Sequence, residues 1–156
     1  MKTILGAFVL ATITAIALPR IAMSQTASKP RESGLYLTVF RSPSTGIEVR
    51  SGHVAGNLGF YPTVLRKDGK RDNANFIRLG GSFYAKDRGS SLYFSPSLAF
   101  SLDKNWKHGA LTELGFRGTV YRALSGRIGV GVLTTTDGQI RVSPTVGMTL
   151  KLGRGR

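Results

Sequence analysis

Residues 91–103, SLYFSPSLAFSLD, alternate between two kinds of side chain along their whole length. One set of alternate positions is apolar throughout: Leu92, Phe94, Pro96, Leu98, Phe100 and Leu102. The positions between them carry mostly serine, with one tyrosine, one alanine and a final aspartate. Because successive side chains of a β-strand point to opposite faces, this alternation predicts a strand with one apolar face and one small, polar face.

Seven further segments show a related pattern, and after the first residues the chain has no sustained helical periodicity. An even number of strands is typical of single-chain β-barrels. We therefore predict an all-β, up-and-down antiparallel β-barrel of about eight strands. The predicted strands are residues 35–41, 46–50, 54–66, 75–86, 91–102, 110–122, 127–134 and 139–152.

The connections between these strands also alternate. The first, third, fifth and seventh are RSPST, KDGKRDN, DKNWKHG and a TTDG turn, whereas the others are SGH, DRGS and an LSG turn. This pattern predicts longer, charged loops at one rim of the barrel and tight glycine turns at the other.

The chain begins with features of a secretory signal peptide. Lys2 precedes an apolar run over residues 4–18, and the small-residue pattern Ala22-Met23-Ser24 follows. The run is shorter than the roughly 20 residues that a membrane-spanning helix needs, so removal is favoured over a membrane anchor. The predicted organisation is a signal peptide over 1–24, a flexible lead-in over 25–33, a barrel over 34–152 and a basic tail over 153–156.

Charge and cysteine content restrict the partners. The formal net charge is +14 and cysteine is absent, which excludes disulfides and thiolate metal sites. A strongly basic chain favours anionic partners, and an export signal favours membrane lipid phosphates over nucleic acid. The densest basic cluster, Arg66, Lys67, Lys70 and Arg71, is the candidate contact for those phosphates, with a solvated turn as the simpler interpretation.

The mid-strand charges fall on the polar face. They are Glu48, Arg50, Arg78, Glu113, Arg117 and Arg141. Two kinds of barrel fit this pattern. A soluble carrier of a lipid or other apolar ligand would turn its apolar face inward, whereas a membrane barrel would turn it outward. A charge at the lipid midplane costs roughly 2–4 kcal/mol, so a membrane barrel would enclose these six residues as a charge network inside its lumen.

The chain resembles the small outer-membrane β-barrel proteins over roughly residues 34–152. The segments FYPTVL (60–65), FSPSLAF (94–100) and VSPTVGM (142–148) are similar to the aromatic- and proline-bearing strands common in that group. Members usually end on an aromatic residue, whereas this chain ends MTLKLGRGR. The resemblance implies an outer-membrane location in a Gram-negative cell envelope, with lipopolysaccharide and other outer-membrane lipids as neighbours.

Prolines and aromatic residues give two further expectations. Pro62, Pro96 and Pro144 fall inside strands, where a closed barrel offers no free edge, so full closure would require a device such as a bulge at these positions. Aromatic residues near strand ends suggest belts at the membrane interfaces. They are Tyr36, Phe40, Phe60, Tyr61, Phe76, Tyr84, Tyr93, Trp106 and Tyr121.

Catalytic chemistry has only a weak signal. Some small outer-membrane barrels modify the acyl chains of lipid A with a histidine and a serine or acidic partner, and His108 lies near Ser101, Asp103 and Trp106. The sequence carries no matching motif, and His53 reads as a turn residue. We therefore predict no enzyme, no cofactor and no metal site. The expected function is structural or surface-interacting, in an outer-membrane barrel with a side-chain-filled lumen.

Overall fold

The computed structural model describes residues 32–42, 44–67 and 69–152. The predicted signal peptide, most of the predicted lead-in and the basic tail lie outside these ranges. In the described part of the chain, no helix is long and apolar enough to cross a membrane.

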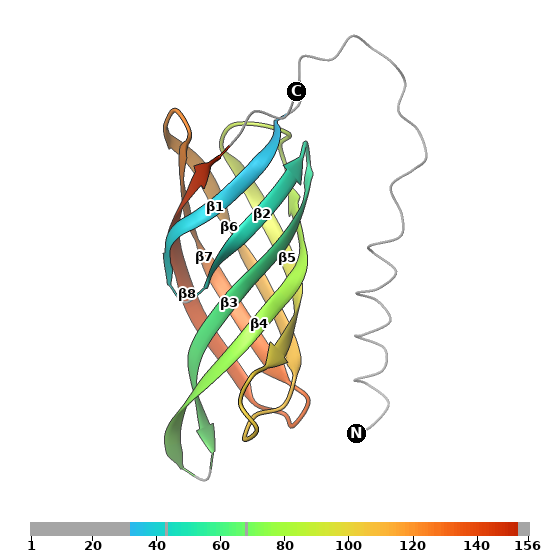
Figure 1. The fold of residues 1–156 in the computed structure, drawn as a ribbon, viewed down its shortest axis with the longest axis vertical. Helices are drawn as coiled ribbons and strands as arrows, with labels where there is room; N and C mark the ends of the chain where they lie inside the picture. The colour runs from blue at the N-terminus through green and yellow to red at the C-terminus, as the bar shows by residue number, and fades with distance from the viewer. Residues whose placement is uncertain (1–31, 43, 68, 153–156) are drawn as a thin grey trace, which may run out of the picture. The chain divides into compact units, whose positions relative to one another are not determined.

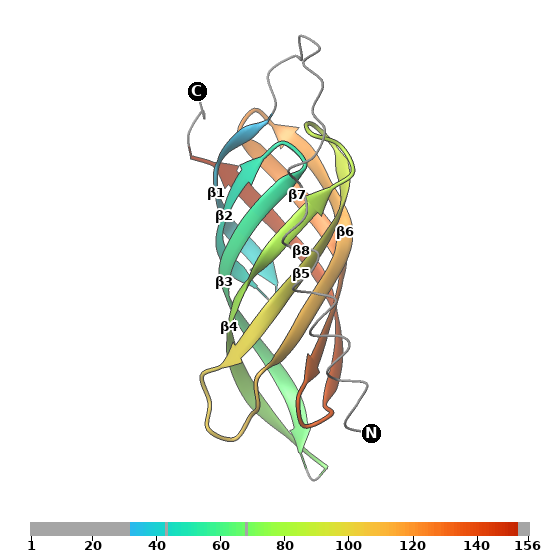
Figure 2. The same cartoon turned by 90° about the vertical axis from the view of Figure 1, so that its right-hand side faces the viewer.

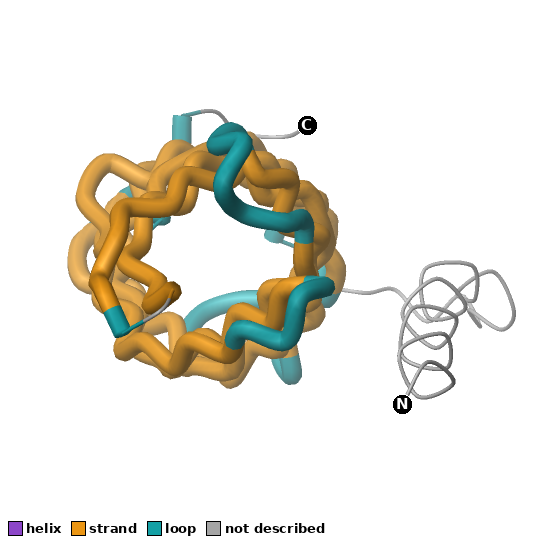
Figure 3. The backbone as a smooth tube through the Cα atoms, turned by 90° about the horizontal axis from the view of Figure 1, so that it is seen from below, coloured by secondary structure: helices purple, strands orange, loops and turns teal. Residues whose placement is uncertain are grey.

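Eight antiparallel strands form one closed barrel, in which each strand pairs with its neighbours in sequence and β1 pairs with β8 (Figures 1 and 2). This arrangement confirms the predicted all-β, up-and-down architecture. The strands are β1 (Ser33–Ser42), β2 (Thr45–Ser51), β3 (Val54–Lys67), β4 (Lys70–Tyr84), β5 (Ser91–Ser101), β6 (Gly109–Tyr121), β7 (Leu124–Thr135) and β8 (Ile140–Lys151). Viewed along its axis, the backbone forms a ring of strands (Figure 3).

The observed connections correct the predicted loop pattern. The segment KDGKRDN forms a tight hairpin instead of a loop, because Gly69 adopts a positive φ of 78° and β4 starts at Lys70, five residues before the predicted start. The fourth connection, which is predicted to be a tight turn, runs over residues 85–90 and is longer than the β7–β8 turn. Loop length therefore does not distinguish the rims. The rim opposite the start of β1 is marked by the projecting β3–β4 hairpin (Figure 1).

Large apolar side chains cover the outside of the barrel. Leu98 is 45% exposed and Leu114 is 62% exposed, and comparable residues lie on every strand. The alternate positions point inward, where Arg50, Arg117 and Glu113 are each only 1% exposed. The faces therefore follow the alternation seen in the sequence, with the apolar face outward.

Glycines allow neighbouring strands of the wall to approach closely. A Cβ on Gly115 would lie 2.5 Å from the Ile128 carbonyl oxygen, and one on Gly129 would lie 2.5 Å from the Leu114 oxygen. Gly115 and Gly129 are paired across β6 and β7. Gly46 and Gly59, paired across β2 and β3, show the same close approach. Strand glycines of this kind mark places where another backbone approaches closely.

An apolar cluster fills the interior near the projecting hairpin. Its largest members are Tyr61, Leu65, Phe76, Trp106, Leu111 and Leu133. Trp106, in the β5–β6 connection, folds inward and donates its Nε1–H to the Asn73 carbonyl oxygen at 3.0 Å. The aromatic-belt prediction is wrong for six residues, because Tyr36, Tyr61, Phe76, Tyr84, Tyr93 and Trp106 are buried inside. Phe60 and Tyr121 do face outward.

The short β1–β2 hairpin leaves two strand segments with a neighbour on one side only. Pairing of β2 with β3 ends at Phe60, and pairing of β1 with β8 ends at Val146. Residues 61–67 of β3 and 140–145 of β8 therefore have no partner strand on their other side within the described residues. We call these two segments the free edges.

The free edges explain two of the prolines. Opposite Pro62, Asn75 directs its N–H to Asp103 Oδ2 and its carbonyl to the Leu102 N–H, which places the Pro62 nitrogen on the open side of β3. Pro144 lies on the other free edge. A strand edge tolerates proline because no partner carbonyl is left without a donor. Bulges do not accommodate these two prolines, because the register shifts instead between Thr38 and Phe40 and between Thr119 and Tyr121.

Pro96 lies in a fully flanked strand and is accommodated differently. The β4–β5 ladder is interrupted where Pro96 meets Gly81. There the Ser95 hydroxyl donates to the Gly81 carbonyl oxygen at 2.9 Å. A side-chain donor thus replaces the missing main-chain donor of Pro96.

Candidate functional site: a charged interior

Five of the six predicted lumen charges are buried inside the barrel. Glu48 and Arg50 come from β2, Arg78 from β4, and Glu113 and Arg117 from β6. Period-two alternation places all five on inward positions because the outward positions beside them are apolar. Arg141 departs from the prediction. It occupies an inward-type position on β8 but is exposed, since it lies at the strand end on a free edge.

Arg127 takes part in the network although it was not among the predicted charges. It is 6% exposed, and its Nη2 lies 2.5 Å from Glu48 Oε2. The sequence does contain a signal for it, because Arg127 shares its alternate positions on β7 with Gly129 and Gly131. That phase places Arg127 on the inner face.

Glu48 is the centre of one half of the network. One of its oxygens lies 3.4 Å from Arg117 Nη1, and the other contacts Arg127. The Tyr84 hydroxyl donates to both carboxylate oxygens, at 2.8 and 3.0 Å, and also contacts Arg127 Nη2. Each Glu48 oxygen is therefore held by a charged and a neutral donor, which is the condition under which a buried carboxylate is tolerated.

Arg50 and Arg117 lie toward the rim where β1 begins. Arg50 donates to the main-chain oxygens of Gly52 and Lys86 at 2.8 and 2.9 Å, and its guanidinium lies 3.8 Å from the Tyr84 ring centroid. Both arginines approach Glu32 at 3.6 Å. Guanidinium groups and tyrosine rings therefore occupy this end of the interior and are held by hydrogen bonds, ion pairs and cation–π contacts.

Glu113 is the centre of the second half. Its Oε2 lies 3.2 Å from Arg78 Nη1, and its Oε1 accepts from Thr145 Oγ1 at 3.1 Å and from the Tyr93 hydroxyl. The other end of Arg78 donates to Ser95 and Ser97 hydroxyls at 3.1 and 3.3 Å. The two serine hydroxyls thus accept hydrogen bonds from the end of Arg78 that does not contact the Glu113 carboxylate.

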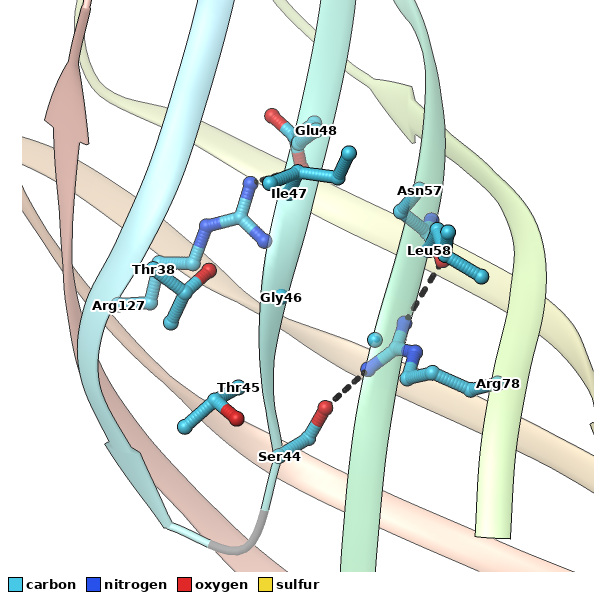
Figure 4. A pocket seen from close by; sticks show the side chains of 11 residues that line it. Thr38, Ser44, Thr45, Gly46, Ile47, Glu48, Asn57, Leu58, Arg78 and Arg127 are labelled. Atoms are coloured by element: carbon cyan, nitrogen blue, oxygen red, sulfur yellow. Dashed lines mark hydrogen bonds and ion pairs between the residues drawn. The ribbon is translucent and has the colours of Figure 1, made fainter.

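A small pocket lies between the two halves, beside the β1–β2 hairpin (Figure 4). Arg78 and Arg127 approach it from opposite sides, and Ser44 Oγ lies 3.5 Å from Arg78 Nη1. The pocket has room for little more than a water molecule. At this level the interior is therefore occupied by side chains.

The predicted lipid-phosphate residues lie together at the tip of the projecting hairpin. Arg66 pairs with Arg71, and Lys67 pairs with Lys70. Arg66, Lys70 and Arg71 are exposed. These residues are separate from the interior network.

In the histidine region, the contacts of His108, Ser101 and Asp103 run through main-chain groups. His108 Nδ1 accepts from the Ser101 main-chain N–H at 3.0 Å, while the Ser101 hydroxyl donates to the Asp103 main-chain oxygen at 2.9 Å. The Asp103 carboxylate instead accepts from the Asn75 N–H. His53 Nδ1 lies 2.9 Å from the Tyr84 carbonyl oxygen beside the β2–β3 turn. Among the described residues, no group of three or more potential metal ligands is present.

No protein-family model matches this chain, and no curated protein matches it. One solved structure, from work on "De novo design of transmembrane beta-barrels", is similar with a TM-score of 0.52. The two sequences are 16% identical, and the match covers 81% of this chain and 100% of the designed one. At that identity the similarity supports the barrel fold alone.

Proposed function

We propose that the chain is an exported outer-membrane β-barrel with a closed, side-chain-filled lumen and a structural or surface-interaction role. One observation carries the proposal: the outer face is apolar on every strand, whereas the buried interior holds Arg50, Arg78, Arg117 and Arg127 with their glutamate partners. Water on the outside would leave this large apolar surface exposed. A bilayer removes that cost.

The interior supports a role other than transport. Ion pairs and tyrosines cross the lumen at the level of Glu48, and a second set crosses it at Glu113. Below them the apolar cluster around Trp106 and Leu133 fills the barrel. An eight-stranded barrel is just wide enough for its side chains to fill it, so the proposal includes neither a pore nor catalysis.

Location follows from the sequence features. The leader over residues 1–24 supports export, and a barrel that crosses a membrane by strands after export fits the outer membrane of a Gram-negative envelope. The proposed partners are outer-membrane lipids and lipopolysaccharide, whose phosphates suit the exposed basic tip of the β3–β4 hairpin. Nucleic acid is not among the proposed partners.

The alternative of a soluble carrier has less support. A carrier of apolar ligands needs an apolar inner surface around a cavity. Here the middle of the interior is charged, and the apolar end is filled by buried side chains such as Phe76 and Leu111. The lipid A-modifying alternative also lacks support, since His108 has no hydroxyl or carboxylate contact of its own among those found in the described chain.

Fractionation and heat-modifiable mobility test the proposal. Cells producing the full chain are separated into soluble, inner-membrane and outer-membrane fractions, and each fraction is run on a gel with and without boiling. We expect the protein in the outer-membrane fraction, with a mobility that changes on boiling. Recovery of folded protein in the soluble fraction without detergent would overturn the proposal.

A further inference from the structure

The two free edges carry exposed arginines on either side of the opening that lies beyond the β1–β2 hairpin. Arg66 lies on the β3 edge, six residues past the last pair with β2, and Arg141 lies on the β8 edge, five residues from the nearest pair with β1. Both are exposed, and neither belongs to the interior network described above. Since β3 adjoins β2 and β8 adjoins β1, each arginine lies on a strand segment that has no neighbour on the side of this opening.

The edges also offer main-chain donors. The orientation of Asn75 fixes the phase of β3, so that the N–H groups of Val64 and Arg66 point to the open side. Proline removes the donor at Pro62 and Pro144, which makes pairing with another strand unfavourable along these edges. The N–H groups that remain on the edges are therefore better suited to hydrogen-bond a small acceptor group than the backbone of another strand.

Apolar side chains lie directly beside these donors on the outer surface. Phe60 is 39% exposed and Val64 is 36% exposed on β3, while Ile140 is 69% exposed and Val142 is 59% exposed on β8. An open sheet edge is not tolerated in the hydrocarbon region, so the free edges of a membrane barrel belong at headgroup level. The combination of cationic groups and N–H donors with adjacent apolar residues matches a lipid that carries a phosphate above an acyl chain.

We propose that the free edges form a docking site for a phosphate-bearing membrane lipid, with Arg66 and Arg141 binding its phosphate groups. The inference rests on the proposed membrane location and identifies a partner for it. It also gives Arg141 a role that the interior network does not. Val64, Ile140 and Val142 then contact the upper part of the acyl chains.

Native mass spectrometry of the full-length, detergent-folded barrel tests the site. The probes are bis-phosphorylated lipid A and the same lipid without its phosphates. The variant is Arg66→Gln with Arg141→Gln. The control, Arg88→Gln with Arg122→Gln, changes two exposed arginines at the opposite rim. A basic residue near anionic lipid contributes about 1 kcal/mol, so we expect about fivefold weaker binding for each edge arginine and about 25-fold for both.

We expect the control variant and the wild type to bind alike, and the phosphate-free lipid to bind weakly to both. Unchanged lipid A binding in the edge variant would overturn the inference. Equal binding of the phosphate-free lipid would do the same, as would displacement by millimolar inorganic phosphate, which would indicate a free-anion site. Lipid-free dimers would indicate that a second copy occupies the edges. Heat-modifiable mobility is measured on every sample, because its loss would contradict the membrane proposal itself.

Discussion

Arg127 on β7 and Glu48 on β2 meet inside the barrel, with Arg127 Nη2 2.5 Å from Glu48 Oε2. The two strands are not neighbours in the sheet, so this ion pair connects separate parts of the wall through the interior. Arg117 on β6 reaches the same carboxylate at 3.4 Å. Glu48 thus links β2 to two strands, β6 and β7, that have no hydrogen-bonded ladder to it.

Replacing Glu48 with glutamine should destabilise the barrel strongly. The change keeps the size of the side chain but leaves Arg117 and Arg127 buried without their common countercharge. Removing one partner of a buried ion pair costs about 3–5 kcal/mol. Urea titration of the folded protein in lipid vesicles, read by gel mobility, measures the loss.

Glu32→Gln serves as the matched control. Glu32 also lies near two arginines, but its side chain is 20% exposed at the rim. We expect a loss of at most about 1 kcal/mol, as for ion pairs with access to water. Equal losses for the two variants would contradict the view that Glu48 holds the interior together.

Gly115→Ala should impair closure of the barrel. The new methyl group would lie 2.5 Å from the Ile128 carbonyl oxygen, so β6 and β7 would have to separate at this point. Gly56→Ala is the control, because a Cβ there meets no atom within 4 Å. The fraction that refolds in detergent, measured on unboiled gels, should fall for Gly115→Ala and stay at the wild-type level for Gly56→Ala.

Leu98→Arg and Leu102→Arg distinguish a lipid-facing surface from a water-facing one. Leu98 lies within β5, and Leu102 directly follows the strand. In a bilayer, arginine costs about 2–4 kcal/mol at the midplane and about 0–1 kcal/mol near the interface. We expect Leu98→Arg to reduce assembly into the outer membrane much more than Leu102→Arg. Similar, small effects at both positions would favour an aqueous surrounding.

Ser95→Ala should destabilise the barrel, because the Gly81 carbonyl loses a donor and Arg78 loses an acceptor. A fully buried acceptor without a donor costs about 1–3 kcal/mol, so the share of the partly buried Gly81 oxygen should not exceed this value. Pro96→Ala supplies a main-chain N–H at the same place. The double variant should therefore recover part of the loss, and a double-mutant cycle of unfolding free energies measures this coupling. Strictly additive effects would contradict the compensation.

Alternation along the chain was sufficient to predict the strands and their faces. Residues 91–102 were predicted as a strand and form β5 with Leu98 outward and Ser97 inward. The same reasoning placed Glu48, Arg78 and Glu113 on one face, because a period of two leaves only two choices. It could not say which strands would meet across the interior, since that depends on the stagger between strands.

Features that depend on where the strands end could not be predicted from the sequence. Arg141 has the inward phase, but only β7 lies beside it and β1 ends before reaching it, so it is exposed. Trp106 and Tyr61 lie near strand ends, as interfacial residues would, yet the β5–β6 connection turns inward over the projecting hairpin and buries them. The tolerance of Pro62 likewise depends on where β2 stops, which the composition of β3 does not reveal.

The brevity of the β1–β2 hairpin also has a consequence for assembly. The seam between β1 and β8 joins the two ends of the chain and is much shorter than the β3–β4 ladder. Its contacts join the segments of the barrel that are furthest apart in the sequence, so they carry the largest entropic cost of loop closure, and we expect them to form last. Amide protons along β1 should therefore exchange with solvent sooner than those of β6. On unfolding, the barrel should open first along the seam between β1 and β8.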